Sequence, residues 1–308
     1  METRRIGSLE VSAVGLGCNN FGVRLDFRGT ERVVAAALDA GVILFDTADI
    51  YGAGKSEEYL GRALKGRRDA VVLATKFGME LDAKRKGARP EYVRRACEDS
   101  LKRLRTDRID LYQLHRPDPE TPIADTLGAL NDLVRGGKVR EIGCSYFTAA
   151  QLREARAAAG SGAAFRSVQN EYSLLTREPE REVLGECERL GMAFIPYYPL
   201  ASGLLTGKYR RGRPAPPNTR LATNRNWNER FLTDRSLQIV ETLAAFAEAR
   251  GHTLLELAVS WLLSRAPVAS VIAGAMSAEQ VRANVAAAAW QLTPADLAEM
   301  DALAPAAA

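Results

Sequence analysis

Cysteine and histidine are scarce in this 308-residue sequence, which has four cysteines and two histidines. The cysteines lie far apart and form no Cys-x-x-Cys pair: Cys18, Cys97, Cys144 and Cys187. This spacing argues against both a zinc site and a disulfide framework. We therefore expect free thiols, as in the cytoplasm, and no bound metal.

The sequence also lacks a strong charge imbalance and any apolar run long enough to span a membrane. Its 42 basic and 38 acidic residues give a formal net charge of +4. The densest basic run, RRACEDSLKRLRTDR, alternates with acidic and apolar residues in the manner of a solvated helix face. The first residues, METRRIGSLE, contain no apolar signal segment. We expect a cytoplasmic protein without nucleic-acid or membrane partners.

Short apolar runs alternate with amphipathic helical patterns along nearly the whole chain. Eight of these runs are predicted strands, beginning at Val11, Val42, Ala70, Ile109, Val139, Phe165, Met192 and Val268. Alternating strands and helices indicate parallel β–α units, and eight such units close a (β/α)8 TIM barrel with helices outside. No linker or composition break divides the chain, so we expect one α/β domain over residues 1–308.

An open, doubly wound sheet is the alternative fold. It would require a Gly-x-Gly-x-x-Gly turn between the first strand and a helix. The glycines of GLGCNNFG are followed by VRLDFRGT, which does not read as a helix start. One long irregular segment, residues 202–230, follows the seventh strand and has the length of a lid or binding loop.

Polar side chains follow several predicted strands at their carboxyl ends, where barrels of this class carry their reacting groups. Asp46 and Tyr51 follow the second strand, Lys76 ends the third and His115 ends the fourth. The phenol of tyrosine has a pKa of about 10, and a neighbouring lysine ammonium would lower it. Asp46 would keep Lys76 charged, and His115 would orient a carbonyl. Such a site protonates carbonyl oxygens and needs a hydride-donating cofactor.

The order of several segments resembles the aldo-keto reductase superfamily. These segments are FDTADIYG, ATKFG, YQLHRPD, VQNEYSLL, YYPLASGLLTGKY and VIAGAMSAEQVRAN. The resemblance implies a (β/α)8 barrel that binds NADPH in extended form and reduces aldehydes, ketones or sugars. It also implies a catalytic tetrad of Asp46, Tyr51, Lys76 and His115.

The same resemblance implies the cofactor contacts. Ser145 and Gln169 would hold the nicotinamide carboxamide, and Tyr197 would stack on the nicotinamide ring. The other implied contacts, at the pyrophosphate and the adenosine, are Leu200, Ser202, Leu204, Lys208, Gly274, Gln280 and Asn284.

Two positions depart from the family pattern. Tyr146 stands where an asparagine usually follows the serine, and Met276 where a polar or basic residue often meets the 2′-phosphate. We expect NADPH to be preferred, with NADH as the alternative and Arg282 or Arg211 as replacements for the missing basic group.

The predicted substrate pocket is apolar and aromatic, with Phe21, Tyr146 and Trp227 in its lining. Neither the substrate nor the oligomeric state follows from the sequence. Two other functions stay open: a cofactor-sensing regulatory subunit, and a Schiff-base lyase with Lys76 as nucleophile. The lyase leaves Tyr197 and the segment GAMSAEQ unexplained.

Overall fold

A computed structural model describes residues 1–304 of the chain. Within these residues, parallel strands form an eight-stranded barrel with the neighbour order β10-β3-β4-β5-β6-β7-β8-β9. The strands are β3 (Val14–Gly17), β4 (Leu44–Asp46), β5 (Val72–Phe77), β6 (Ile109–Leu114), β7 (Val139–Ser145), β8 (Ser167–Glu171), β9 (Ala193–Tyr197) and β10 (Val271–Gly274). Between β9 and β10, the Phe194 amide donates to the Pro267 carbonyl at 2.6 Å and the Ala269 amide donates to the Phe194 carbonyl at 3.0 Å. The predicted (β/α)8 barrel is confirmed.

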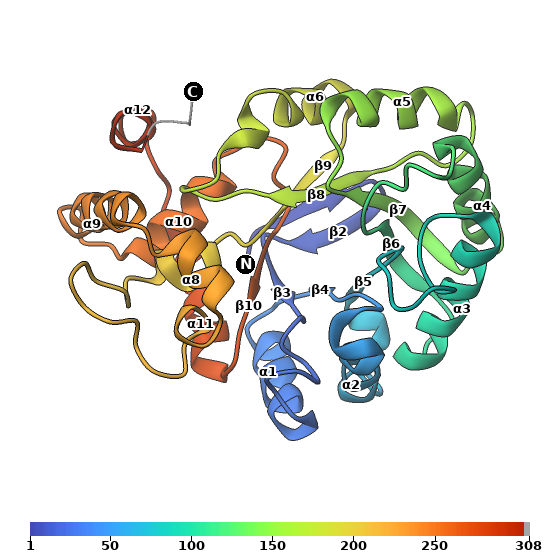
Figure 1. The fold of residues 1–308 in the computed structure, drawn as a ribbon, viewed down its shortest axis with the longest axis horizontal. Helices are drawn as coiled ribbons and strands as arrows, with labels where there is room; N and C mark the ends of the chain where they lie inside the picture. The colour runs from blue at the N-terminus through green and yellow to red at the C-terminus, as the bar shows by residue number, and fades with distance from the viewer. Residues whose placement is uncertain (305–308) are drawn as a thin grey trace.

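Helices surround the strands (Figure 1). They are α1 (Phe27–Asp39), α2 (Lys55–Ala63), α3 (Pro90–Leu104), α4 (Ile123–Arg135), α5 (Ala149–Ala159), α6 (Val183–Leu190), α7 (Arg220–Thr223), α8 (Arg225–Phe231), α9 (Asp234–Glu248), α10 (Leu254–Leu263), α11 (Ala278–Ala286) and α12 (Pro294–Leu303). Short 3₁₀ segments are η1 (Tyr51–Gly54), η2 (Arg68–Ala70), η3 (Glu178–Glu180), η4 (Ala201–Thr206) and η5 (Ala287–Ala289). In the described part of the chain, no helix has the length and apolar character needed to span a membrane.

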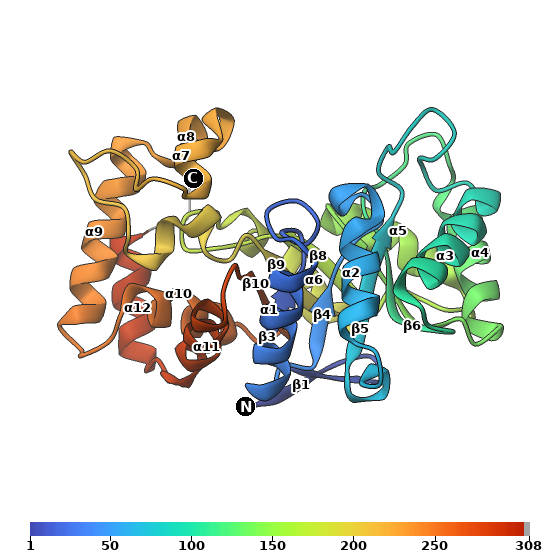
Figure 2. The same ribbon diagram turned by 90° about the horizontal axis from the view of Figure 1, so that it is seen from below.

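An antiparallel hairpin of β1 (Thr3–Ile6) and β2 (Leu9–Ser12) precedes the barrel. The sequence predicted one strand beginning at Val11, but Val11 ends up in the hairpin and the barrel strand begins at Val14. The Ser12 hydroxyl accepts from the Ile43 amide at 3.0 Å and donates to the Val14 carbonyl at 2.7 Å. These bonds fix the bend between β2 and β3. Figure 2 shows β1 at the end of the molecule opposite α7 and α8.

The interior of the barrel changes from apolar to polar along the strands. Because side chains alternate across a strand, every second residue points inward. In β4 the inward residues are Leu44 and then Asp46, and in β5 Ala74 is followed by Lys76. The apolar members pack with Ile6 and other hairpin residues in one buried cluster. The polar members therefore meet at the carboxyl end of the barrel, away from the hairpin.

The segment 202–230, expected to be irregular, contains all of α7 and most of η4 and α8. Each of these is too short for a hydrophobic period to reveal it. The Asn224 side chain caps α8 by accepting from the Trp227 amide at 3.1 Å. Only part of this segment is therefore loop.

Candidate active site

A buried ion pair lies at the carboxyl ends of β4 and β5. The Lys76 ammonium donates to the Asp46 carboxylate at 2.5 Å and to the Thr47 carbonyl at 2.9 Å. The two side chains are almost completely buried. Burial is the largest single influence and disfavours the ammonium, but Asp46 and Tyr51 together outweigh it, so the pKa of Lys76 lies above its usual value. Lys76 is therefore a fixed positive charge.

Two glutamines hold Asp46 in place. The side-chain amides of Gln113 and Gln169 each donate to the second Asp46 oxygen at 3.1 Å, and Gln169 also donates to Gln113 at 3.3 Å. Gln113 was missed by the sequence reasoning. The sequence could have indicated Gln113, because it is a polar residue within the apolar run of β6. It lies two positions before His115 and therefore points to the same inward face.

Tyr51 enters the site from the turn η1, where Gly52, Ala53 and Gly54 all have positive φ. A side chain at Gly54 would put its Cβ 2.8 Å from Arg103, so this turn requires glycine there. The Lys76 ammonium lies 5.2 Å from the centroid of the Tyr51 ring.

The pKa of Tyr51 corrects the sequence prediction. Lys76 was expected to bring it down, and its charge does act in that direction. Burial is the larger effect and raises the pKa of Tyr51 above its usual value. The phenol consequently keeps its proton at neutral pH, which suits a proton donor.

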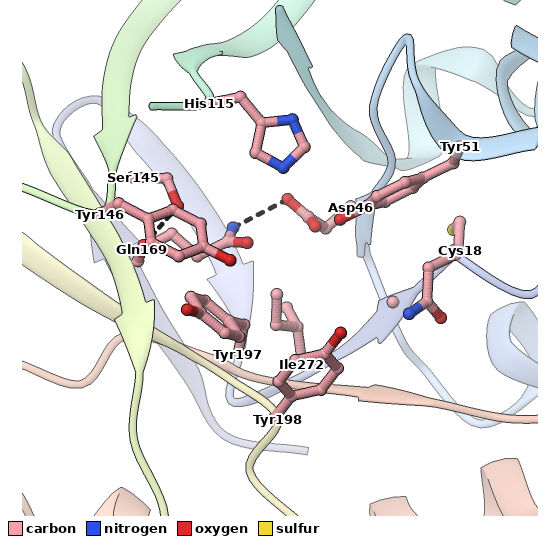
Figure 3. Close-up of a pocket in the computed structure, with 12 residues that line it drawn as sticks. Cys18, Asp46, Tyr51, His115, Ser145, Tyr146, Gln169, Tyr197, Tyr198 and Ile272 are labelled. Carbon is pink, nitrogen blue, oxygen red and sulfur yellow. Dashed lines mark hydrogen bonds between the residues drawn. The ribbon is translucent and has the colours of Figure 1, made fainter. Parts of the chain in front are cut away.

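His115 lies opposite Tyr51, and their rings meet edge to face with centroids 5.9 Å apart (Figure 3). Its side chain is buried, and its Nδ1 has no hydrogen-bond partner among residues 1–304. Burial, together with the charges of Lys76 and Arg116, lowers the pKa of His115 to about 2. The imidazole is thus neutral, and its Nδ1 is available for a hydrogen bond.

A pocket brings these groups together with three predicted cofactor residues. Its lining includes Asp46, Tyr51, His115, Ser145, Tyr146, Gln169, Tyr197 and Tyr198 (Figure 3). Both amide hydrogens of Gln169 are directed to Asp46 and Gln113, which leaves its Oε1 free to accept. The Ser145 hydroxyl donates to the main-chain carbonyl of Gln169 at 2.5 Å, so the hydroxyl oxygen can also accept. These acceptors suit a carboxamide NH₂ group.

A groove continues from this pocket, and Asn19, Tyr198 and Ile272 line both. The groove brings together most of the other predicted cofactor residues: Leu200, Ser202, Lys208, Gly274, Gln280 and Asn284. Leu204 is an exception, since its side chain is fully buried in the hydrophobic core. The Ser202 hydroxyl is buried without a hydrogen-bond partner in the described chain.

The basic groups of the groove differ from those expected. Arg282 is exposed and pairs with Glu279 at 3.3 Å, and neither Arg282 nor Arg211 lines the groove. The lining cations are Arg24, Lys208 and Arg220, and none of them has an acidic partner within residues 1–304. Desolvation, with repulsion from Arg24 and Arg220, lowers the pKa of Lys208. Three cations without acidic partners in one groove favour an anionic ligand there.

Of the predicted substrate-pocket residues, only Tyr146 is among the described lining residues. Phe21 is fully buried in the hydrophobic core, where its ring fills space beneath the first loop. Trp227 packs on Tyr198, with ring centroids 4.6 Å apart, and so lies behind the pocket wall.

Asp49, in the same loop as Tyr51, does not line the pocket. It is buried, and neither oxygen has a side-chain hydrogen-bond partner in the described residues. Burial and the nearby Glu57 charge raise the pKa of Asp49 to about 7. Asp49 therefore belongs to the packing behind the loop and not to the reacting groups.

The chain is similar to known proteins in both sequence and fold. The sequence profile of the Aldo/keto reductase family matches residues 13–305. "Probable aldo-keto reductase 1" of Glycine max is 36% identical over 300 residues, covering 94% of this chain and 85% of the relative. The holo form of aldo-keto reductase AKR11C1 from Bacillus halodurans has a TM-score of 0.83 and 32% identity, covering 100% of this chain and 97% of its own. Glycerol dehydrogenase AKR11B4 from Gluconobacter oxydans has a TM-score of 0.85 and 32% identity, and the match covers 98% of this chain and 94% of that chain.

Proposed function

The chain belongs to the aldo/keto reductase family, and from this premise we propose that it reduces aldehyde or ketone carbonyls to alcohols with NADPH. The observation that carries the proposal is the charged Lys76–Asp46 pair beneath a protonated Tyr51, with a neutral His115 opposite. Sugars in their open-chain form present the same carbonyl group.

The residues of the pocket and groove fit a nicotinamide dinucleotide. Free acceptors on Gln169 and Ser145 suit the carboxamide, and the Tyr197 ring offers a stacking face. The unpaired Lys208 and Arg220 suit phosphate groups, because charged donors make strong hydrogen bonds to phosphate oxygens. Bound NADPH would supply the hydride that reaches the carbonyl carbon.

The side chains of the pocket orient the carbonyl and protonate its oxygen as negative charge develops there. His115, being neutral, donates a hydrogen bond that orients the carbonyl. Tyr51 gives its proton to the oxygen as negative charge develops there. The Lys76 ammonium stabilises the resulting phenolate, and Asp46 keeps that ammonium charged and in place. In the direction of alcohol oxidation, the same groups act in reverse.

A Schiff-base lyase is less well supported. A lysine nucleophile must be neutral, and a depressed pKa is the usual means to that end. Here Asp46 raises the pKa of Lys76 and holds its ammonium at 2.5 Å. The same contacts that suit Lys76 to electrostatic support make it a poor nucleophile.

We expect NADPH to bind more tightly than NADH, because the groove holds more basic groups than a pyrophosphate alone would need. Lys208→Met is expected to weaken NADPH binding about tenfold or more, the loss typical of a hydrogen bond to a charged group. Fluorescence quenching titrations with both reduced cofactors measure this, with Arg282→Gln as the matched control outside the groove. Equal or tighter binding of NADH by the wild type would contradict the NADPH preference.

A further inference from the structure

An arginine lies at the border between the active-site pocket and a second cleft. Arg116 directly follows His115 and lines the cleft formed by residues 78–95 and 116–120. Its guanidinium carbon lies 4.6 Å from the centroid of the Tyr146 ring. Tyr146 in turn lines the active-site pocket. The pair thus connects the two cavities.

The backbone of Tyr146 is strained in a way that favours this contact. Its φ of 62° lies in the left-handed region, which residues other than glycine adopt only at a cost in free energy. The residue is 40% exposed, yet its ring contacts that of Tyr197 with centroids 5.2 Å apart. Strained residues of this kind concentrate at binding and catalytic sites. The Tyr146 ring lines the pocket, and the Arg116 guanidinium stacks on it.

Arg116 has no acidic partner in the described part of the chain; the same holds for Lys84 and Arg95 of this cleft, but only Arg116 of the three lies against a residue of the active-site pocket. In the same cleft, Arg89 pairs with Glu120 at 3.0 Å and Lys86 pairs with Glu80 at 3.5 Å. The positive charge of Arg116 also acts on the imidazole of His115, whose pKa it helps to lower. A free positive charge therefore stands beside the reacting groups.

We propose that Arg116, held by Tyr146, is a specificity-determining residue that recognises carbonyl substrates bearing a carboxylate or phosphate group. Stacking on an aromatic face leaves the N–H groups at the edge of the guanidinium free, and these match the two oxygens of such an anion. Tyr146 restricts the arginine to one orientation, which lowers the entropy that binding would otherwise cost. The inference rests on the proposed function, since it names the substrate class of that site.

Matched pairs of aldehydes test this assignment: para-formylbenzoate against para-formylbenzamide, and glyceraldehyde phosphate against glyceraldehyde. The wild type should show a higher kcat/KM for the anionic member of at least one pair, and the pair shows whether carboxylate or phosphate is recognised. Arg116→Gln should reduce this preference about tenfold or more, mainly through KM, while the neutral aldehydes change little. Arg116→Lys should keep part of the preference.

Arg89→Gln serves as the control, because it removes a charge from the same cleft that is already paired. An unchanged anionic preference in Arg116→Gln, or its equal loss in Arg89→Gln, would overturn the assignment. Calorimetric binding of the same aldehydes separates this result from failure of the proposed function. If the wild type reduces none of them but Arg116→Gln still loses affinity for the anions, the assignment stands and the reductase is wrong.

Discussion

Replacing Tyr51 by phenylalanine is expected to lower kcat for carbonyl reduction by about 10²–10⁴-fold, the range of general acid catalysis. This loss corresponds to roughly 3–5 kcal/mol of barrier at about 1.36 kcal/mol per tenfold. Phenylalanine keeps the ring and its edge-to-face contact with His115, so the loop should hold its shape. NADPH affinity should scarcely change, because the lost hydroxyl is directed to the substrate carbonyl.

The control for this variant is Tyr59→Phe, since Tyr59 packs on Phe27 away from the pocket. Single-turnover rates and cofactor titrations on both variants give the comparison. Unchanged reduction in Tyr51→Phe would show that another group donates the proton. Tight NADPH binding without any reduction by the wild type would instead favour the regulatory, cofactor-sensing subunit.

Replacing Lys76 by methionine is expected to abolish most turnover while leaving cofactor binding largely intact. Without the ammonium, nothing stabilises the Tyr51 phenolate as it forms. The substitution also leaves Asp46 as a buried carboxylate without its cation, which typically costs about 3–5 kcal/mol of folding free energy. A drop in melting temperature should therefore accompany the loss of activity.

A double variant separates the two effects of Lys76→Met. Adding Asp46→Asn removes the buried charge but keeps an oxygen that can accept from Gln113 and Gln169. The double variant should regain much of the lost stability and none of the turnover. Recovery of activity would mean that Lys76 acts only through folding. A borohydride-trapped adduct of substrate on wild-type Lys76 would point to the lyase.

Three of the four residues proposed to be catalytic could be located from the sequence because they lie at strand ends. A strand's alternation and its last residue can be read from the sequence, and parallel strands bring their carboxyl ends to one edge. Asp46, Lys76 and His115 follow from that rule. The burial of Leu204 and Phe21 does not follow from it, because Leu204 lies in the short 3₁₀ segment η4 and Phe21 in the loop after β3, where no strand alternation shows which side chains enter the core.

Effects that depend on distance through space were not predictable either. The direction of the Tyr51 pKa depends on burial against the charge of Lys76, and only the folded structure fixes that balance. Arg24 and Arg220 are far apart in sequence, yet both line the groove with Lys208. Neither belongs to a strand or a periodic helix that would have predicted its direction.

The most direct test of the account is the fate of the hydride. An aldehyde is reduced by the wild type with NADPH that carries two deuterium atoms at its hydride-donating carbon, and the alcohol is analysed by mass spectrometry. The account predicts one deuterium on the carbinol carbon of the product, formed far more slowly by Tyr51→Phe. An alcohol without deuterium, or no alcohol from any aldehyde or ketone while NADPH binds tightly, would contradict it.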